Sequence, residues 1–421
     1  MSKDQTTIKF ARAPQDADVA EIQIRVIGVG GGGGNAVNTM AKAGLSHVRF
    51  VAANTDQQAL AESKADDVIA LGVGLTRGLG AGARPAVGRD AALESRSSIS
   101  EVLTGADMVF VTAGMGGGTG TGATPIIAEA AQEHGALTVA IVTRPFSFEG
   151  KRRRRTADEG IEELKEVADT LVVIPNDRLV ALAGPEMSTM DAFKLADKVL
   201  FDAVRSIVEL IHVKGVVNAD FADVKTVMSV PGLAMMGLGT ATGELRAVEA
   251  AQRAISSPLL EEAVITGARG VLVNVTSSAN LKLAELNEAV TLIEEEAHED
   301  AEVIFGWVVD EAMGEEVRVT VLATGLEARQ ESLERGLTEP VQRPIDRLLK
   351  AEPQDRTTAV SPWAVLPADA WDLPPSVRQE REPSVPDPAL LERKSHEIVQ
   401  AQVDEDMAHL DKPTFVRRLA D

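Results

Sequence analysis

In the first half of the chain, short apolar runs alternate with longer stretches that have a helical period. The runs are rich in Val, Ile and Ala, and they predict strands at residues 22–29, 48–53, 107–112, 137–143 and 170–174. Helices are expected between the strands, the first at residues 36–43, where Gly44 ends it. This alternation predicts an α/β domain of the Rossmann-like class, with a parallel sheet covered by helices on both faces.

The longest helical pattern follows, from Ser188 to Lys214. Its apolar residues recur at steps of three and four: Ala196, Val199, Leu200, Ala203, Val204, Ile207, Val208 and Ile211. These steps predict one amphipathic helix. About 25 residues at 1.5 Å each reach roughly 38 Å, which is enough to cross a domain.

Beyond the long helix the order of elements changes. We expect strands near residues 224–230 and 270–277, and helices near residues 243–256 and 284–297. Two more strands, at residues 303–309 and 316–323, are close enough in sequence to predict an antiparallel pair. A second, smaller α+β domain is therefore predicted.

Past Gly325 the composition changes, because ten of the 19 prolines fall between Glu327 and Ala408. Mixed charge and weak apolar periodicity predict a disordered linker there, in which Trp363 and Trp371 are either a docking patch or residues without a role. The expected organisation is a flexible tail (1–21), a first domain (22–187), a central helix (188–214), a second domain (215–326), the linker (327–409) and a terminal peptide (410–421).

Two glycine-rich segments follow predicted strands, at residues 28–34 and 114–122. The second leads into a helix, for which Thr124 is the predicted N-cap and Pro125 the first helical residue. A strand, a glycine segment and a helix N-terminus in that order form an anion site, because backbone N–H groups and the helix dipole both favour negative charge. The alternative, a flexible connector, explains neither the strand nor the cap.

The first glycine segment also satisfies G-x-G-x-x-G, and Asp56 lies where a ribose-binding acid is expected. A dinucleotide-binding oxidoreductase is therefore one alternative. It leaves the second glycine segment unexplained, and none of the six histidines lies in a recognisable catalytic site. Two glycine segments suit one polyphosphate held from two sides.

The composition excludes several further classes of protein. The chain has no Cys, which excludes disulfides and thiolate metal sites, and no apolar run approaches the length of a membrane span. The N-terminus lacks a signal-peptide apolar region. A formal net charge of −22 disfavours nucleic acid. We expect a soluble, cytoplasmic protein that binds no nucleic acid and does not insert into membranes.

The residues Gly116-Gly117-Gly118-Thr119-Gly120-Thr121-Gly122 resemble the signature of the tubulin/FtsZ superfamily. Further segments resemble the bacterial FtsZ family in the same order along the chain, at residues 31–35, 54–56, 80–83, 144–150, 175–177 and 218–223. The similarity covers about residues 22–325 and the terminal peptide. It implies a GTPase that polymerises head-to-tail into the filaments of the bacterial division ring and hydrolyses GTP at the subunit interface.

The resemblance implies a role for each residue around the glycine segments. The phosphates of GTP or GDP are contacted by Asn35, Gly118, Thr119 and Gly120. The opposite wall is formed by Gly31, Gly32, Gly33 and Gly34, and Ala81, Gly82 and Ala83 belong to the same site. Glu149 and Arg153 hold the ribose side.

The resemblance assigns contacts with the base to Phe193 and Asp197, which are four residues apart on the long helix and therefore share one face. A ring that stacks on a base, beside a carboxylate that accepts from guanine N1–H and the exocyclic amine, suits guanine and not adenine. The resemblance adds Asn176 as a further contact to the base. Without the rest of the site, a core Phe and a solvated Asp would be the simpler interpretation.

Asn218, Asp220 and Asp223 lie in a short loop after the long helix. The two carboxylates repel phosphates, but they can orient a water or hold a cation near the γ-phosphate. In the family this loop enters the nucleotide site of the next subunit, so the resemblance implies that these residues act on a neighbour. Alone, the loop is an ordinary acidic turn, and a non-hydrolysing homologue would lack its acids.

The resemblance also implies Mg²⁺ held mainly through the phosphates, with no metal site of the protein's own, and leaves K⁺ open. The run Lys151-Arg152-Arg153-Arg154-Arg155 opens a helix, where cations oppose the dipole. Only Arg153 matches a nucleotide contact of the family, and a solvated basic face is the simpler interpretation of the rest.

The terminal peptide from Leu410 to Asp421 places Phe415, Val416 and Leu419 beside two arginines. This pattern fits a short helix that folds on a partner, with a frayed terminus as the alternative. The resemblance implies membrane-tethering and regulatory division proteins as its partners, and a location at the mid-cell division site.

Overall fold

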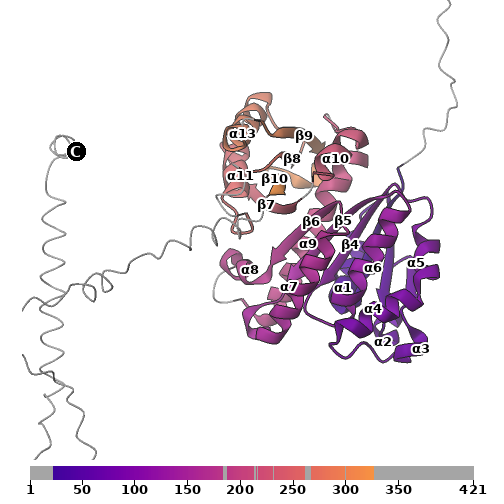
Figure 1. Ribbon diagram of the computed structural model, residues 1–421. Coiled ribbons are helices and arrows are strands. Elements are labelled where there is room, and N and C mark those ends of the chain that lie inside the picture. The colour runs from indigo at the N-terminus through magenta and orange to yellow at the C-terminus, as the bar shows by residue number, and fades with distance from the viewer. Residues whose placement is uncertain are drawn as a thin grey trace, which may run out of the picture. The chain divides into compact units, whose positions relative to one another are not determined.

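Ten strands form one sheet, in the order β3-β2-β1-β4-β5-β6-β7-β10-β8-β9 (Figure 1). The computed structural model describes residues 22–183, 187–212, 215, 217–230, 232–260, 267–298 and 300–326. The predicted tail at residues 1–21, the linker with its two tryptophans and the terminal peptide lie outside these residues.

The first six strands are all parallel, which confirms the predicted parallel α/β sheet. They are β1 (Ile24–Val29), β2 (Val48–Asn54), β3 (Asp67–Ala70), β4 (Met108–Gly114), β5 (Leu137–Arg144) and β6 (Thr170–Pro175). Of these six strands, only β3 was not predicted from the sequence. Its four residues include an Asp and are too short for a clear apolar run.

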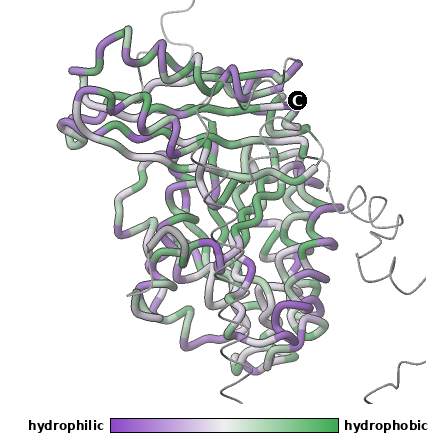
Figure 2. Tube along the Cα trace, turned by 90° about the vertical axis from the view of Figure 1, so that its left-hand side faces the viewer, coloured by the Kyte–Doolittle hydropathy of each residue, from purple (hydrophilic) through white to green (hydrophobic). Residues whose placement is uncertain are grey.

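Helices cover both faces of this part of the sheet, and the hydrophobic positions gather towards the inside of the molecule (Figure 2). One face packs against α1 (Gly30–Ala43) and α9 (Thr189–His212). The other packs against α4 (Pro85–Glu94), α5 (Arg96–Leu103), α6 (Thr119–Glu133) and α7 (Lys151–Lys165). Three short helices complete this half: α2 (Gln57–Ala61), α3 (Val73–Thr76) and α8 (Asn176–Ala183).

Helix α9 is the predicted long amphipathic helix. Its 24 residues span about 36 Å at 1.5 Å each. Its buried residues share one core with Val26 of β1 and also with Leu272 and Leu322, which lie in strands of the second half of the sheet. The helix therefore packs against both halves of the sheet.

The C-terminal half contains four strands, β7 (Leu233–Ala241), β8 (Gly270–Ser277), β9 (Glu302–Val309) and β10 (Val317–Leu326). Among the described residues of this half, the α-helices are α10 (Phe221–Met228), α11 (Arg246–Ile255) and α13 (Leu283–Glu296), of which α11 and α13 pack on one face of these strands. The strand predicted at residues 224–230 is wrong. Those residues lie mostly in α10, whose buried Val224, Val227 and Met228 follow a helical step.

The predicted antiparallel pairing of the last two strands is also wrong. Strand β10 pairs antiparallel with β7 and β8, whereas β9 pairs parallel with β8 at the edge of the sheet. Proximity in sequence favours a hairpin, but β10 fills the place between β7 and β8 instead. Strand β7 is unpredicted because two of its residues are glycines. A Cβ at Gly237 or Gly239 would lie 2.0 Å from a carbonyl oxygen of α11.

The two halves of the sheet meet at a short junction. Strands β6 and β7 are parallel and pair through Leu171 with Leu233 and Val172 with Ala234 only. Helix α9 packs across both halves, so its apolar face adds most of the contact that this brief pairing cannot supply.

The first glycine segment continues directly into a helix, since Gly30 to Gly34 begin α1 and do not form the predicted loop. In the second segment, residues 115–118 form the predicted turn between β4 and α6, and only its last residues are helical. Helix α1 begins at Gly30 and α6 at Thr119, so Thr124 is not an N-cap and Pro125 lies inside the helix. The Thr124 hydroxyl instead donates to the carbonyl of Gly120, at 2.5 Å. Glycine disfavours helices intrinsically. Here close packing overrides that preference, since a Cβ at Gly122 would lie 1.9 Å from the carbonyl oxygen of Pro85.

Neighbouring glycines of α1 should respond in opposite ways to a methyl group. A Cβ at Gly33 would lie 2.3 Å from the carbonyl oxygen of Thr112, whereas one at Gly34 would meet nothing within 4 Å. Gly33→Ala should therefore lose about 1–3 kcal/mol of unfolding free energy through overpacking. Gly34→Ala should gain about 0.5–1 kcal/mol through helix propensity. Urea unfolding without nucleotide measures both, and equal stability of the two variants would contradict this packing.

Candidate functional site

The N-termini of α1 and α6 meet at the carboxyl ends of two adjacent strands. Helix α1 follows β1 and α6 follows β4, and these strands pair through Val29 and Ala113. From this point the strand order runs outward in both directions, to β2 and β3 on one side and to β5 and β6 on the other. In open α/β sheets, ligands bind at such a switch point.

The two helix N-termini approach each other backbone to backbone. A Cβ at Gly30 would lie 2.9 Å from the amide nitrogen of Gly120, and one at Gly32 would lie 3.1 Å from that of Gly114. Neither helix has a side chain that caps its N-terminus. The unpaired N–H groups of the first turns, together with two helix dipoles, therefore favour an anion between the helices.

The glycines divide into those that pack and those that face open space. Gly28, Gly33 and Gly120 pack against backbone, whereas a Cβ at Gly31, Gly34 or Gly117 would meet nothing within 4 Å. Asn35, the next residue of α1, is exposed. The open positions leave room for a ligand beside the N–H groups.

A third wall comes from residues 79–84. A Cβ at Gly118 would lie 2.9 Å from the Cβ of Ala81 and 3.2 Å from the amide nitrogen of Ala83. Ala83 has φ of 54°, a left-handed conformation that costs a non-glycine residue about 1–2 kcal/mol. Such strain persists only where surrounding structure imposes it, and it is common at ligand sites.

Thr55 anchors this wall to α6, a role that sequence reasoning missed. Its buried hydroxyl lies 2.6 Å from that of Thr119, and its carbonyl accepts from the Gly80 amide at 3.1 Å. Thr55 does lie inside one of the segments that carry the family resemblance, residues 54–56, so a signal was present. The hydrogen bonds place residues 80–83 beside the start of α6.

An aromatic cluster lies at the N-terminal end of α9. The ring of Phe193 meets Phe146 edge-on at 5.3 Å and Phe148 edge-on at 6.4 Å, and Phe146 and Phe148 are stacked at 5.1 Å. Phe146 is buried, whereas Phe148 is 65% and Phe193 41% exposed. Two exposed rings side by side offer an apolar surface for a planar ligand.

Two polar groups of the candidate site are in surroundings that do not satisfy them, because one is buried without a hydrogen-bond partner and the other is desolvated. The side-chain Oδ1 of Asn176 is buried and has no hydrogen-bond partner among the described residues. Burial raises the pKa of Asp197 to about 6, because desolvation disfavours its charged form. A ligand with N–H donors would stabilise both groups.

Glu149 and Arg153 form an ion pair, Oε2 to Nη1 at 3.1 Å. The other carboxylate oxygen of Glu149 accepts from the Phe146 amide at 2.9 Å, which fixes the loop before α7. The loop is also tied to α8, since Asp177 accepts from the amide of Ser147 at 2.8 Å. These contacts hold the predicted ribose-side residues next to the aromatic cluster.

The acidic loop lies far from all of these residues within one chain. Asp220 is the N-cap of α10 by its backbone, but its side chain makes no capping hydrogen bond, and Asp223 is exposed on the first turn. Asn218 accepts from the amide of Gly215 at 2.7 Å. From Asp197 to His212, α9 rises about 22 Å, and the loop follows its far end. The acids therefore cannot reach the glycine segments of their own chain.

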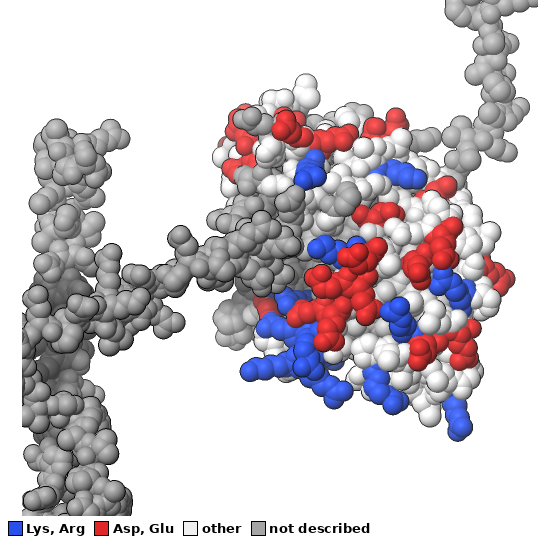
Figure 3. Space-filling model, viewed as in Figure 1, with Lys and Arg blue, Asp and Glu red and all other residues white. Residues whose placement is uncertain are grey.

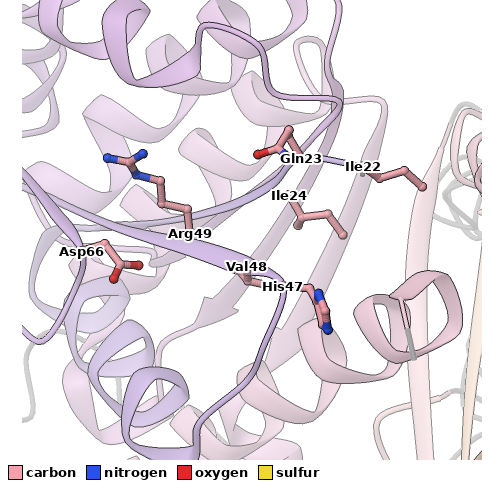
Figure 4. A pocket seen from close by; sticks show the side chains of 7 residues that line it. All are labelled: Ile22, Gln23, Ile24, His47, Val48, Arg49 and Asp66. Atoms are coloured by element: carbon pink, nitrogen blue, oxygen red, sulfur yellow. The ribbon is translucent and has the colours of Figure 1, made fainter. Parts of the chain in front are cut away.

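A cavity of about 540 Å³ lies elsewhere (Figure 4). It is lined by the residues at the start of β1 and β2, Ile22, Gln23, Ile24, His47, Val48 and Arg49, together with Asp66. Because the glycine segments lie at the opposite ends of these strands, this cavity is separate from the candidate site. Within the described residues, no three His, Asp or Glu side chains gather as a metal site, and no helix could span a membrane.

Comparison with known proteins agrees with this geometry. Residues 23–184 match the GTPase domain model of the tubulin/FtsZ family, and residues 232–327 match the C-terminal domain model of the FtsZ family. The cell division protein FtsZ of Pseudomonas aeruginosa is 50% identical over 94% of this chain and 97% of its own length. That of Pseudomonas putida is 48% identical over the same shares.

Solved structures are similar as well. An FtsZ dimer of M. jannaschii without ligand has a TM-score of 0.71 and 46% identity, over 73% of this chain and 89% of that one. CetZ2 of Haloferax volcanii, solved as a GTPγS-bound protofilament, has a TM-score of 0.64 over 78% of this chain and all of that one. At 21% identity, CetZ2 supports the fold alone. The chain is a member of the FtsZ family of tubulin-like GTPases.

Proposed function

We propose that the chain binds GTP between α1 and α6 and hydrolyses it only where two copies meet head-to-tail in a filament. The observation that carries this proposal is the separation of about 22 Å along α9 between Asp197 and the end of the helix before the acidic loop. A pocket and acids that cannot meet in one chain can meet between two. Such a heterologous contact repeats without closing, which gives open filaments.

The phosphates would lie on the N–H groups of the two helix starts. Gly31, Gly32, Gly33, Gly34 and Asn35 form one wall, and Gly118, Thr119 and Gly120 form the other. The open space at Gly31 and Gly34 supports this assignment. Ala81, Gly82 and Ala83 close the third side, and Glu149 with Arg153 faces the ribose.

Guanine would be held by the aromatic cluster and the two polar groups beside it. Phe193 supplies an exposed ring, and the unpartnered Asn176 and the desolvated Asp197 supply acceptors. An acceptor pair suits the N1–H and amine of guanine, whereas adenine has no N1–H to donate.

Asp220 and Asp223 of one copy, positioned with Asn218, would orient the attacking water at the γ-phosphate in the next copy. Magnesium bound with the nucleotide would neutralise phosphate charge. Whether hydrolysis also requires potassium is a separate question that belongs to the same site. The filament would assemble at the mid-cell division site. Membrane-tethering and regulatory proteins would bind it through the peptide from Leu410 to Asp421.

A shared active site makes hydrolysis depend on protein concentration. GTPase rate is expected to stay near zero below a threshold concentration and to rise linearly above it, with light scattering appearing at the same threshold. The reason is that each new filament contact adds one complete site. A rate per molecule that does not change with concentration would rule out the shared site, and an absence of GTP binding would rule out the pocket.

Asp223→Ala should keep GTP binding and lose hydrolysis by at least about 100-fold, since removing a transition-state group typically costs several kcal/mol. Adding this variant to wild-type filaments should lower the total rate in proportion to its share. Glu288→Ala, at an exposed carboxylate of α13, is the matched control and should behave as wild type. Weakened nucleotide binding in Asp223→Ala would place this residue in its own chain's pocket.

GTP affinity should fall as pH falls through about 6, because guanine donors favour the charged form of Asp197 and protonation removes that acceptor. Asp197→Asn should bind about 10–100-fold more weakly at neutral pH and lose this pH dependence. Titration calorimetry between pH 5 and 8 measures both. Asp191→Asn, on the same helix but exposed, should keep the dependence.

Asp197 also affects the stability of the fold, with the opposite dependence on pH. A folded-state pKa above that of the unfolded chain means that stability from Asp197 is present at low pH and lost as pH rises through about 6. Asp197→Asn should therefore raise the thermal stability of the nucleotide-free protein more at pH 7 than at pH 5, because the loss begins near the ordinary carboxyl pKa of 3.8 and is complete only above about 6. Loss of stability at pH 7 would show that the carboxylate supports the fold.

Deleting residues 410–421 should leave GTP-dependent assembly unchanged and abolish recruitment of the filaments to the division site. Assembly is followed by light scattering and location by fluorescence in cells. If the truncated chain fails to assemble, the peptide has a role within the filament, and the proposed tether is wrong.

A further inference from the structure

Five consecutive cations begin α7, and their partners differ. Arg153 pairs with Glu149 at 3.1 Å, and Arg154 pairs with Asp177. Arg155 meets Glu159 at 3.7 Å, with both side chains more than two-thirds exposed. Lys151 and Arg152 are exposed and form no ion pair with any described residue. The run therefore leaves two cations with their full charge in solvent.

These two cations do not stabilise the helix that carries them. They occupy its first turn, where the dipole is positive, and each such charge opposes the helix at low ionic strength. The turn has no acidic residue of its own, and Gly150 supplies no side-chain cap. The fold of α7 gives no reason for their presence.

The location of Lys151 and Arg152 does give a reason for their presence. The first turn of α7 lies against the second glycine segment, because a Cβ at Gly116 would meet the Cγ and the carbonyl oxygen of Arg153, each at 2.6 Å. Lys151 and Arg152 lie within one turn, about 5.4 Å of rise, of that contact. Figure 3 shows basic side chains gathered beside the acidic ones on this side of the molecule. The unpaired charge thus lies at the rim of the phosphate site.

The whole chain repels the nucleotide. Its formal net charge is −22, and free GTP carries several negative charges. A local positive potential at the rim of a site can raise the association rate of an oppositely charged ligand by about 10–1,000-fold over the uncharged case. Charges at a rim act mainly on association and much less on dissociation.

We propose that Lys151 and Arg152 attract the polyphosphate of guanine nucleotides to the site and thereby set the rate of nucleotide entry. The proposal rests on the nucleotide site proposed above. It assigns the two residues a positioning role, distinct from the contact assigned to Arg153. In a filament-forming GTPase, this rate determines how fast a subunit that has released GDP is recharged.

The test is stopped-flow binding of a fluorescent GDP analogue to the full chain, because GDP has no γ-phosphate to hydrolyse and binding is then measured without turnover. Lys151→Glu/Arg152→Glu should lower the association rate constant about tenfold or more at an ionic strength of about 10 mM, where the Debye length is about 30 Å. The difference should shrink to less than about twofold at 1 M salt, where that length is about 3 Å. The dissociation rate constant should change less than about twofold.

Lys42→Glu/Lys64→Glu is the matched control, since it changes the net charge by the same amount at two exposed lysines away from the glycine segments. It should leave association nearly unchanged. A second readout is thermal stability without nucleotide, which should stay the same or rise in Lys151→Glu/Arg152→Glu because acids favour a helix N-terminus.

Each outcome decides between possibilities. Equal slowing by both double variants would assign the effect to net charge and overturn the proposal. A faster dissociation rate with unchanged association would make the two residues direct ligands and also overturn it. Unchanged kinetics in Lys151→Glu/Arg152→Glu would overturn it while leaving the nucleotide site intact. Absence of analogue binding in the wild-type chain would instead reject the site itself.

Discussion

The contact between the N-termini of α1 and α6 is the constraint on which the rest of the site depends. The two helices follow adjacent strands, and their first turns approach so closely that only glycine fits at Gly30, Gly33 and Gly120. This contact aligns two sets of unpaired N–H groups on one space. The walls formed by residues 79–84 and by the start of α7 pack against Gly118 and Gly116, in the turn that leads into α6.

Helix α9 sets the second constraint, which is separation. It carries Phe193 and Asp197 near its start, and the acidic loop follows its end. A rigid helix keeps these two groups apart in every copy, so one molecule holds a binding surface at one end and acids at the other. If hydrolysis requires both, as proposed above, it waits for a second molecule and is thereby coupled to assembly.

The sequence predicted the parallel sheet, the long helix and the glycine segments at the ends of two strands, because apolar periodicity and runs of glycine are local signals. The sequence-based prediction failed where contacts between residues far apart in the sequence determine the local structure or the strand order. The glycines of α1 and α6 are helical because strands and loops press against them, which no helix propensity records. Residues 224–228 belong to α10 although valines such as Val224 and Val227 also favour strands. The pairing of β9 with β8 depends on β10, a later strand, taking the inner position.

In the candidate site, too, the residues could be named from the sequence but the contacts between distant residues could not. Asp197 and Asn176 were named through the family resemblance, but the desolvation of one and the missing partner of the other exist only in three dimensions. The link between Thr55 and Thr119 joins residues 64 positions apart. Distances of that kind cannot be obtained from one sequence.

The junction between β6 and β7 has a mechanical consequence. Only two residue pairs join the halves of the sheet there, while α9 packs on both. In the head-to-tail filament proposed above, a pull along the axis would enter each subunit at the acidic loop and leave at the glycine face. Helix α9 packs on both halves across that path, so it would carry tension that the two residue pairs of β6 and β7 cannot carry alone.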